Sequence, residues 1–309
     1  MGAVWSPTGG PDLGAAGVAV ARADAGRRRR GEERSTRLED TPPFLPLRSV
    51  GPGAVLDGAF DVLRFRLGRM VGLAATLYAP LLLVQFLFEL RYGLAAGSDQ
   101  GAGSTPFVVA ALGATQNGWG LVFVVLNQLA LSLLGMAAGF QVAAWLDGQD
   151  PTYGTTLRFM ARRSWVALGL VLLTALFRVP FLCLSILGWW ISDAFVFSVS
   201  AAAGGEGLGP WAAMRATVRR ARHALGFAMV VSLGGLAISM VLRTALWLGP
   251  LALVSATVPS GLLAVLVARL GALVLLVTEP LVACIAARAW LELRCRTEGY
   301  DLERWRDAR

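Results

Sequence analysis

Long apolar stretches recur along the chain from residue 69 onwards, separated by segments of which only every second one is rich in arginine. Six of the stretches come near the roughly 20 residues that an α-helix needs to cross a bilayer. They lie at 69–88, 119–145, 164–185, 187–204, 225–248 and 261–287. The pattern predicts an all-α, polytopic membrane bundle of six transmembrane helices. The apolar segment 106–114 is too short to span and is a candidate re-entrant piece.

The arginines are concentrated in every second segment between these stretches. Residues 1–69 hold eleven, 147–163 hold three, 206–224 hold four and 288–309 hold six, whereas 92–118 and 249–260 hold none. Segments rich in arginine stay on the cytoplasmic side of a membrane. The sequence therefore predicts a multi-pass protein with both termini in the cytoplasm.

The two ends of the chain differ from the part between them. Residues 1–46 show no helical or strand period and carry an arginine block at 27–30, which is typical of a disordered tail. Residues 47–304 form the predicted membrane domain, and 305–309 form a short C-terminal tail.

A threefold repeat divides the membrane domain into units of about 52–148, 151–207 and 210–299. Each unit opens with a proline twelve residues before an arginine: Pro52 and Arg64, Pro151 and Arg163, Pro210 and Arg222. An apolar stretch follows each arginine, and each unit ends in an acidic residue followed by glycine, at Asp147-Gly148, Glu206-Gly207 and Glu298-Gly299. We predict three transmembrane hairpins, each preceded by a cytoplasmic interfacial helix.

The openings of the units have the pattern of helices that lie in the headgroup plane. Proline suits a first helical turn, because the N–H that it lacks has no partner there. In the third unit Met214, Val218 and Ala221 form an apolar face beside an arginine stripe. Four arginines of this unit are candidates for contact with lipid or a partner protein: Arg215, Arg219, Arg220 and Arg222. In the second unit Thr155 and Arg162 occupy the apolar positions, so plain linkers remain an alternative.

Five charged residues fall inside the predicted spans, where burial is costly and a functional role is the first hypothesis. They are Arg178, Asp193, Arg243, Arg269 and Glu279. Counted at 1.5 Å per residue, Arg178 and Asp193 reach similar depths in consecutive spans, so we predict that they pair. Arg243 falls near the outer end of its span, where it can extend to the interface. Glu279 falls toward the cytoplasmic side of the last span. Ion pairs between helices are favoured over a path for protons or substrate.

Glycines four residues apart mark two predicted spans. They are Gly68 and Gly72 in the first span, and Gly135 and Gly139 in the second. Small residues at this spacing let helices approach closely, and we predict packing within the bundle rather than a dimer face.

The inventory of polar residues excludes several kinds of chemistry. All 28 basic residues are arginine, so the phosphate-binding loop and the Schiff-base lysine are excluded. The single histidine, His223, excludes a two-histidine metal site. Cys183, Cys284 and Cys295 show no C-x-x-C spacing, and their odd number, with two of them in apolar runs, indicates reduced, buried thiols. The arginines are spread between spans, so the net charge of +8 predicts no nucleic-acid partner, and no cofactor is predicted.

Two end motifs resemble those of a bacterial family, the glycerophosphoryl diester phosphodiesterase membrane domain-like proteins. The opening motif lies at 49–60, with extra residues around Pro52-Gly53, and the closing motif at 291–303 has Glu292 where the family more often has Asp. The resemblance covers about residues 46–304. It implies a six-span protein of the bacterial cytoplasmic membrane without the phosphodiesterase domain of some relatives, for which this chain has no room. The lysine-free composition is also typical of a high-GC bacterium.

These observations predict a non-enzymatic scaffold or accessory subunit. Its expected partners are membrane lipids and a membrane or envelope protein. The alternative is a transporter or lipid-handling protein that uses the intramembrane charges. Pro80, Pro180 and Pro280 interrupt three predicted spans and keep that alternative open.

Overall fold

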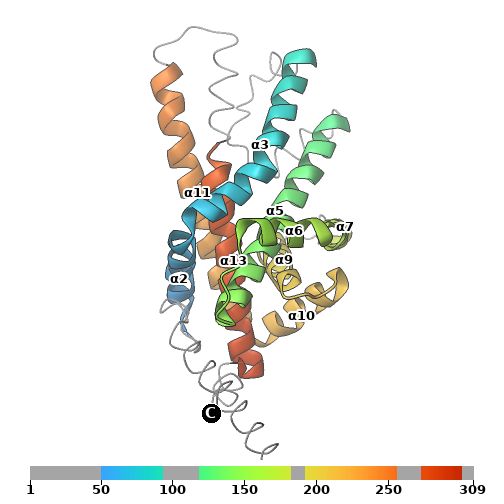
Figure 1. The fold of residues 1–309 in the computed structure, drawn as a ribbon, viewed down its shortest axis with the longest axis vertical. Coiled ribbons are helices and arrows are strands. Elements are labelled where there is room, and N and C mark those ends of the chain that lie inside the picture. Colours follow the sequence, from blue (N-terminus) through green and yellow to red (C-terminus); the bar gives the residue numbers. More distant parts are fainter. Residues whose placement is uncertain (1–49, 93–117, 182–191, 256–272, 301–309) are drawn as a thin grey trace, which may run out of the picture.

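A computed structural model describes residues 50–92, 118–181, 192–255 and 273–300, and every element within these ranges is a helix (Figure 1). In chain order they are α2 (Pro52–Phe65), α3 (Leu67–Tyr92), α5 (Gly118–Leu146), α6 (Tyr153–Arg162), α7 (Ser164–Phe181), the π-helix η1 (Ser192–Phe197), α9 (Ser198–Gly205), α10 (Pro210–His223), α11 (Leu225–Ser255) and α13 (Leu275–Glu298). The predicted all-α class is confirmed. The predicted tails, 1–46 and 305–309, and the segment 106–114 lie outside the described residues.

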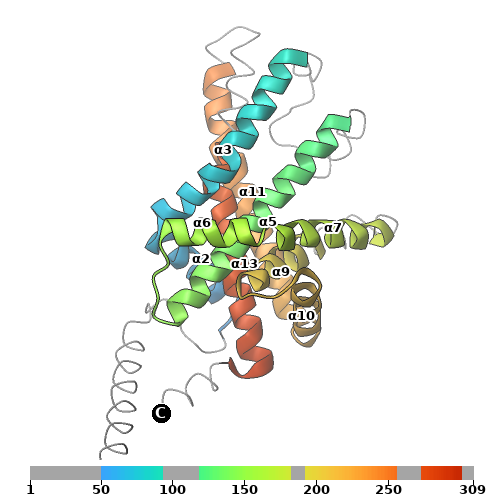
Figure 2. The same ribbon diagram turned by 45° about the vertical axis from the view of Figure 1, so that its right-hand side comes forward.

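Three described helices are long and apolar enough to cross a membrane, over Leu67–Gln85, Val125–Leu146 and Leu225–Leu246. A fourth candidate results if Tyr153–Arg162 and Ser164–Leu176, which meet at a bend of 56°, are counted as one broken span. Figure 2 shows α6 and α7 lying across the rising helices α3 and α5. The structure thus shows three to four candidate spans.

The last described helix, α13, occupies the middle of the bundle. It packs against α2, α3, α5, α9, α10 and α11 (Figures 1 and 2). From Thr278 to Leu293 every residue is buried except Val282, which is half-buried. Small residues such as Ala283 and Ala287 make this possible, because they let neighbouring helices approach from every side.

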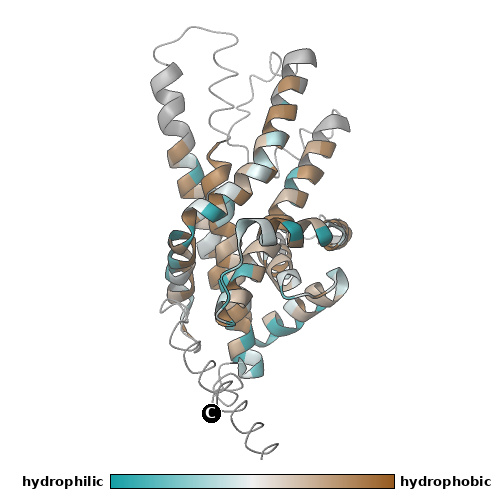
Figure 3. Cartoon of the chain, viewed as in Figure 1, coloured by the Kyte–Doolittle hydropathy of each residue, from teal (hydrophilic) through white to brown (hydrophobic). Residues whose placement is uncertain are grey.

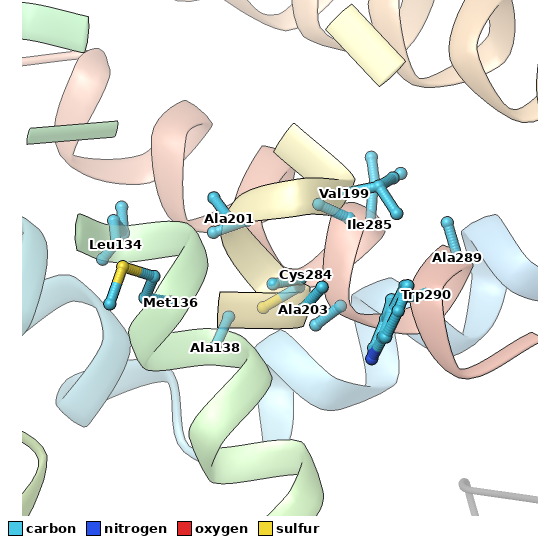
Figure 4. Close-up of a cluster of buried hydrophobic side chains, with 14 of the residues drawn as sticks. Leu134, Met136, Ala138, Val199, Ala201, Ala203, Cys284, Ile285, Ala289 and Trp290 are labelled. Atoms are coloured by element: carbon cyan, nitrogen blue, oxygen red, sulfur yellow. The ribbon is translucent and has the colours of Figure 1, made fainter. Parts of the chain in front are cut away.

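The closest helix contact joins α5 to α9 through glycine. A Cβ atom added at Gly139 would lie 2.1 Å from the carbonyl oxygen of Ala202, and one at Gly205 would lie 2.5 Å from that of Met136. Figure 4 shows the side chains of α5, α9 and α13 that meet around this contact. The prediction of internal packing is confirmed for Gly135 and Gly139. It is wrong for Gly68, whose added Cβ would have nothing within 4 Å.

The first and third units open with the same local structure. α2 and α10 each have 14 residues and begin at a proline. Each breaks before the next helix at a residue with φ −136°, Arg66 (ψ 44°) or Ala224 (ψ 42°). The helices that follow begin at Leu67 and Leu225, three residues after the repeat arginines Arg64 and Arg222.

The second unit departs from this pattern. Its helix α6 has 10 residues and is capped by Thr152, whose hydroxyl accepts a hydrogen bond from the N–H of Thr155 (3.3 Å). The prediction of Pro151 in the first helical turn is therefore wrong, because Pro151 precedes the cap. The buried positions are Thr156 and Met160. These buried positions are shifted by one residue from the apolar face that the sequence predicts. The segment is a helix and not a plain linker.

The acid-glycine steps end helices. Gly148, Gly207 and Gly299 have φ of 68°, 98° and 63°, and they are the glycines with positive φ in the described ranges. They follow the ends of α5, α9 and α13, where a left-handed residue stops a helix at little cost only if it lacks a Cβ. Figure 3 shows polar residues collected on α2, α6, α10 and the C-terminal part of α13, which we call the polar end of the bundle.

We predict that Gly139→Ala lowers thermal stability in detergent, because its methyl group would collide with the backbone of α9. Overpacking of this kind costs about 1–3 kcal/mol. Gly68→Ala, which also adds a methyl group to a helix, is the matched control and should melt like the unaltered protein. Equal melting temperatures for the two variants in a fluorescence unfolding assay would contradict the α5–α9 contact.

Candidate functional site

An ion pair lies between two of the helices at the centre of the bundle. Arg243 of α11 pairs with Glu279 of α13, and the Glu279 side chain is only 3% exposed. Tyr78 of α3 is fully buried and lies within electrostatic reach of both charges. We call these three residues the Tyr78–Arg243–Glu279 cluster.

The ion pair corrects the depth expected for Arg243. The sequence predicts Arg243 near the outer end of its span and Glu279 toward the cytoplasmic side, which separates them. α13, however, continues to Glu298, well beyond the predicted span end at residue 287. Arg243 lies 18 residues from the start of α11 and Glu279 lies 19 residues from the end of α13, so the two are level when counted from the polar end.

The cluster keeps unused hydrogen-bonding capacity. Within the described part of the chain, the Tyr78 hydroxyl, Arg243 Nε and Glu279 Oε2 are buried and have no hydrogen-bond partner. Pro280, directly after Glu279, supplies no N–H to the carbonyl of Leu276 one turn earlier. A water molecule or a polar ligand atom would satisfy such groups.

The side chains of three predicted intramembrane charges lie outside the described part of the structure. Arg178 lies in α7 and Asp193 in the π-helix η1, but their side chains lie outside the described set, as does all of Arg269. The pairing of Arg178 with Asp193 therefore stays a prediction.

Asp150 joins the start of α3 to the loop before α6. Its carboxylate accepts hydrogen bonds from Arg66 (2.6 Å), Arg69 (2.6 Å) and the Trp145 indole (3.2 Å). Arg69 also donates to the carbonyl of Pro151 (2.6 Å). The hydrogen bond from Arg69 is the main reason that the pKa of Asp150 falls from 3.8 to about 2.

A second group of charges joins α9, α10 and α13. Arg220 donates to Glu298 (Nε to Oε1, 3.0 Å) and lies over the Trp290 ring at 4.4 Å. Arg294 donates to both oxygens of Glu206 (2.9 Å each). Burial alone would raise the pKa of Glu298, but the hydrogen bond and charge of Arg220 hold it below its usual value.

The two ends of the described chain meet at Glu292. Its Oε1 accepts hydrogen bonds from the backbone N–H of Val50 (2.9 Å) and from Arg296 (2.7 Å). Nearby, a Cβ added at Gly58 would lie 3.1 Å from the guanidinium of buried Arg288. The opening segment and the C-terminal helix thus form one structural unit.

The repeated arginines have different surroundings. Arg163 donates to the carbonyl of Leu208 (3.0 Å), whereas Arg64 and Arg222 are exposed. On α10, Arg215 and Arg219 are exposed as well, but Arg220 is buried against α13. The prediction that all four arginines of α10 face lipid or a partner is therefore wrong for Arg220.

Several functional contacts were not predicted from the sequence. Arg66, Arg69, Arg294 and Arg296 were counted for topology alone, although each makes an ion pair. Their only sequence signal is an excess of arginine, which does not identify the acidic partner. Cys284 and Cys295 are buried, as predicted, and neither forms a disulfide with a described residue.

Comparison with known proteins supplies no relative. No protein-family model matches the chain, and no curated protein and no solved structure matches it either. Within the described ranges, no group of three or more His, Cys, Asp or Glu side chains is placed to hold a metal ion.

We predict a pH-dependent contribution of Asp150 to stability. Because its pKa is lower in the folded protein, the ionised carboxylate stabilises the fold above pH 4, and this contribution is lost as the pH falls toward 2. Asp150→Asn should lower the melting temperature at pH 7 by about 1–3 °C, as expected for a partly exposed ion pair. The difference from the unaltered protein should shrink as the pH falls from 4 to 2.

The control is Asp57→Asn, which changes an exposed carboxylate on α2 that forms no ion pair with another described residue. It should melt like the unaltered protein at every pH. A deficit of Asp150→Asn that stays constant down to pH 2 would contradict the role of the carboxylate charge.

Proposed function

We propose that the protein is a non-enzymatic scaffold or accessory subunit of the bacterial cytoplasmic membrane. In this proposal the chain has six spans in three hairpin units, its termini are cytoplasmic, and the polar end presents fixed helical faces to a partner protein. The three to four candidate spans and the shared geometry of α2 and α10 support this arrangement.

One observation carries the proposal: charged side chains connect the polar-end helices to the bundle. Asp150 holds α3 to the loop before α6, Arg220 holds α10 to α13, and Glu292 holds residue 50 to α13. Ion pairs of this kind favour one arrangement of helices over alternatives. Helices held in this way present their outer faces in a constant orientation, as a docking protein requires.

Two of these outer faces carry exposed charges. On α2 they are Asp57, Asp61 and Arg64, and on α6 they are Arg158 and Arg162. Mixed charge on one helix and pure positive charge on another would distinguish a correct partner from a wrong one.

The resemblance to the glycerophosphoryl diester phosphodiesterase membrane domain-like family belongs to the same proposal. Its support is that the two motifs behind the resemblance lie in contact, because the backbone of Val50 bonds to the side chains of Glu292 and Arg296. Motifs so far apart in the chain have a common structural reason when they pack on each other.

A transporter or lipid-handling protein is the second candidate. The Tyr78–Arg243–Glu279 cluster supports it, because buried polar atoms without partners near Pro280 resemble the broken-helix sites of transporters. The ion pair itself favours the scaffold, since Arg243 neutralises Glu279 and the two hold α11 to α13.

The test is extraction of the full-length protein from native membranes into polymer discs, followed by mass spectrometry. We expect a protein partner in fixed stoichiometry. Its amount should fall at least fivefold in Asp57→Ala/Asp61→Ala/Arg64→Ala or in Arg158→Ala/Arg162→Ala, because each variant removes one exposed face. Both variants should keep the normal melting temperature, since all five residues are exposed.

The matched control is Arg22→Ala/Arg37→Ala, which removes two charges from the N-terminal segment and should retain the partner. A protein that is isolated alone, with a defined small molecule bound in fixed stoichiometry, would overturn the scaffold in favour of the transporter.

A further inference from the structure

Helix α10 has two distinct faces. Ala213, Met214, Thr217, Arg220 and Ala221 are buried against the bundle. The opposite face shows four exposed residues at spacings of four, four and three: Trp211, Arg215, Arg219 and Arg222. At 3.6 residues per turn these positions form one continuous line along the helix. We call this line the α10 stripe.

The orientation of the stripe is fixed at both ends of the helix. At the start, Pro210 packs on α7, where a Cβ added at Gly169 would lie 2.8 Å from the proline ring. At the end, Arg220 is held by Glu298 and by the face of Trp290. The helix therefore cannot turn its arginines toward the bundle.

The charge of the stripe is not neutralised by the described part of the protein. α10 contains no acidic residue, and Arg215, Arg219 and Arg222 form no ion pair with a described residue. Like charges three and four residues apart on a helix repel one another. An anionic ligand along the stripe would remove this repulsion.

The position of the stripe identifies that ligand. α10 ends at His223, and the candidate membrane span Leu225–Leu246 begins two residues later. At about 1.5 Å per residue, Arg222 and Arg219 lie within roughly 5 and 9 Å of the start of that span. The headgroup layer is about 5–8 Å deep on each side of the hydrocarbon core, so their long side chains reach it.

The residue types fit a phospholipid surface. A guanidinium binds the oxygens of a phosphate in a bidentate fashion. An exposed tryptophan such as Trp211, 57% exposed, is typical of the membrane–water interface. We propose that the α10 stripe binds the headgroups of anionic phospholipids in the leaflet where α11 begins. This inference depends on residence in a membrane and is independent of the scaffold role.

The test is native mass spectrometry of the full-length protein in detergent with equal amounts of phosphatidylglycerol and phosphatidylcholine. The unaltered protein should retain phosphatidylglycerol preferentially, and the preference should fall as salt rises. Each arginine near an anionic surface contributes about 1 kcal/mol, so Arg215→Gln/Arg219→Gln/Arg222→Gln should reduce the preference at least tenfold. The single variants should reduce it in part, which keeps the test valid if the triple variant folds poorly.

The matched control is Arg27→Gln/Arg28→Gln/Arg29→Gln, which removes the same charge from the N-terminal segment and should keep the preference. An equal loss of the phosphatidylglycerol preference in this control would show that overall charge, and not the α10 stripe, causes the preference. The absence of any preference in the unaltered protein, or an unchanged preference in the triple variant, would also overturn it. Absence of any protein partner from the unaltered protein, with the lipid preference intact, would count against the scaffold alone.

Discussion

The structure depends on one constraint: a helix that carries several charges passes through the middle of an apolar bundle. α13 holds Glu279, Arg288 and Glu292 at positions with at most 3% exposure. A buried charge without a partner costs far more than a buried ion pair. The neighbouring helices must therefore lie where their polar groups meet those of α13, and this requirement selects one arrangement among the many that apolar packing alone would allow.

The surrounding helices meet this requirement in different ways. α11 supplies Arg243 to Glu279, and α10 supplies Arg220 to Glu298 at the end of α13. The backbone at Val50 supplies an N–H to Glu292. Beside α13, the close contact between α5 and α9 is made by small residues, as at Gly139 and Ala202. Polar contacts set the register, and the small residues allow the close approach that makes the contacts possible.

Much of the local structure could be predicted from the sequence, and the long-range contacts could not. Proline at residues 52 and 210 and the glycines after acidic residues marked helix ends correctly, because these signals act through the backbone of a few neighbouring residues. α6 begins after Thr152 and not at Pro151. The Thr152 side chain accepts a hydrogen bond from a backbone N–H of the first helical turn, which a proline side chain cannot do. The pair of Arg243 and Glu279 was missed because depth was counted from an assumed end of the last span. The buried state of Arg220 among exposed neighbours depends on Trp290 and Glu298, which lie 70 and more residues away.

The most direct test of this account is the register between α11 and α13, measured by cysteine cross-linking in native membranes. A Cβ at Gly235 would lie 3.3 Å from Cγ2 of Ile285, so the two positions face each other across the contact between α11 and α13. In a background with the native cysteines replaced by serine, Gly235→Cys/Ile285→Cys should cross-link rapidly, and Gly235→Cys/Val277→Cys should not. Cross-linking of residue 235 to residue 277 instead would place Glu279 at the depth that the predicted span lengths give. It would separate Glu279 from Arg243 and contradict the central role given to α13.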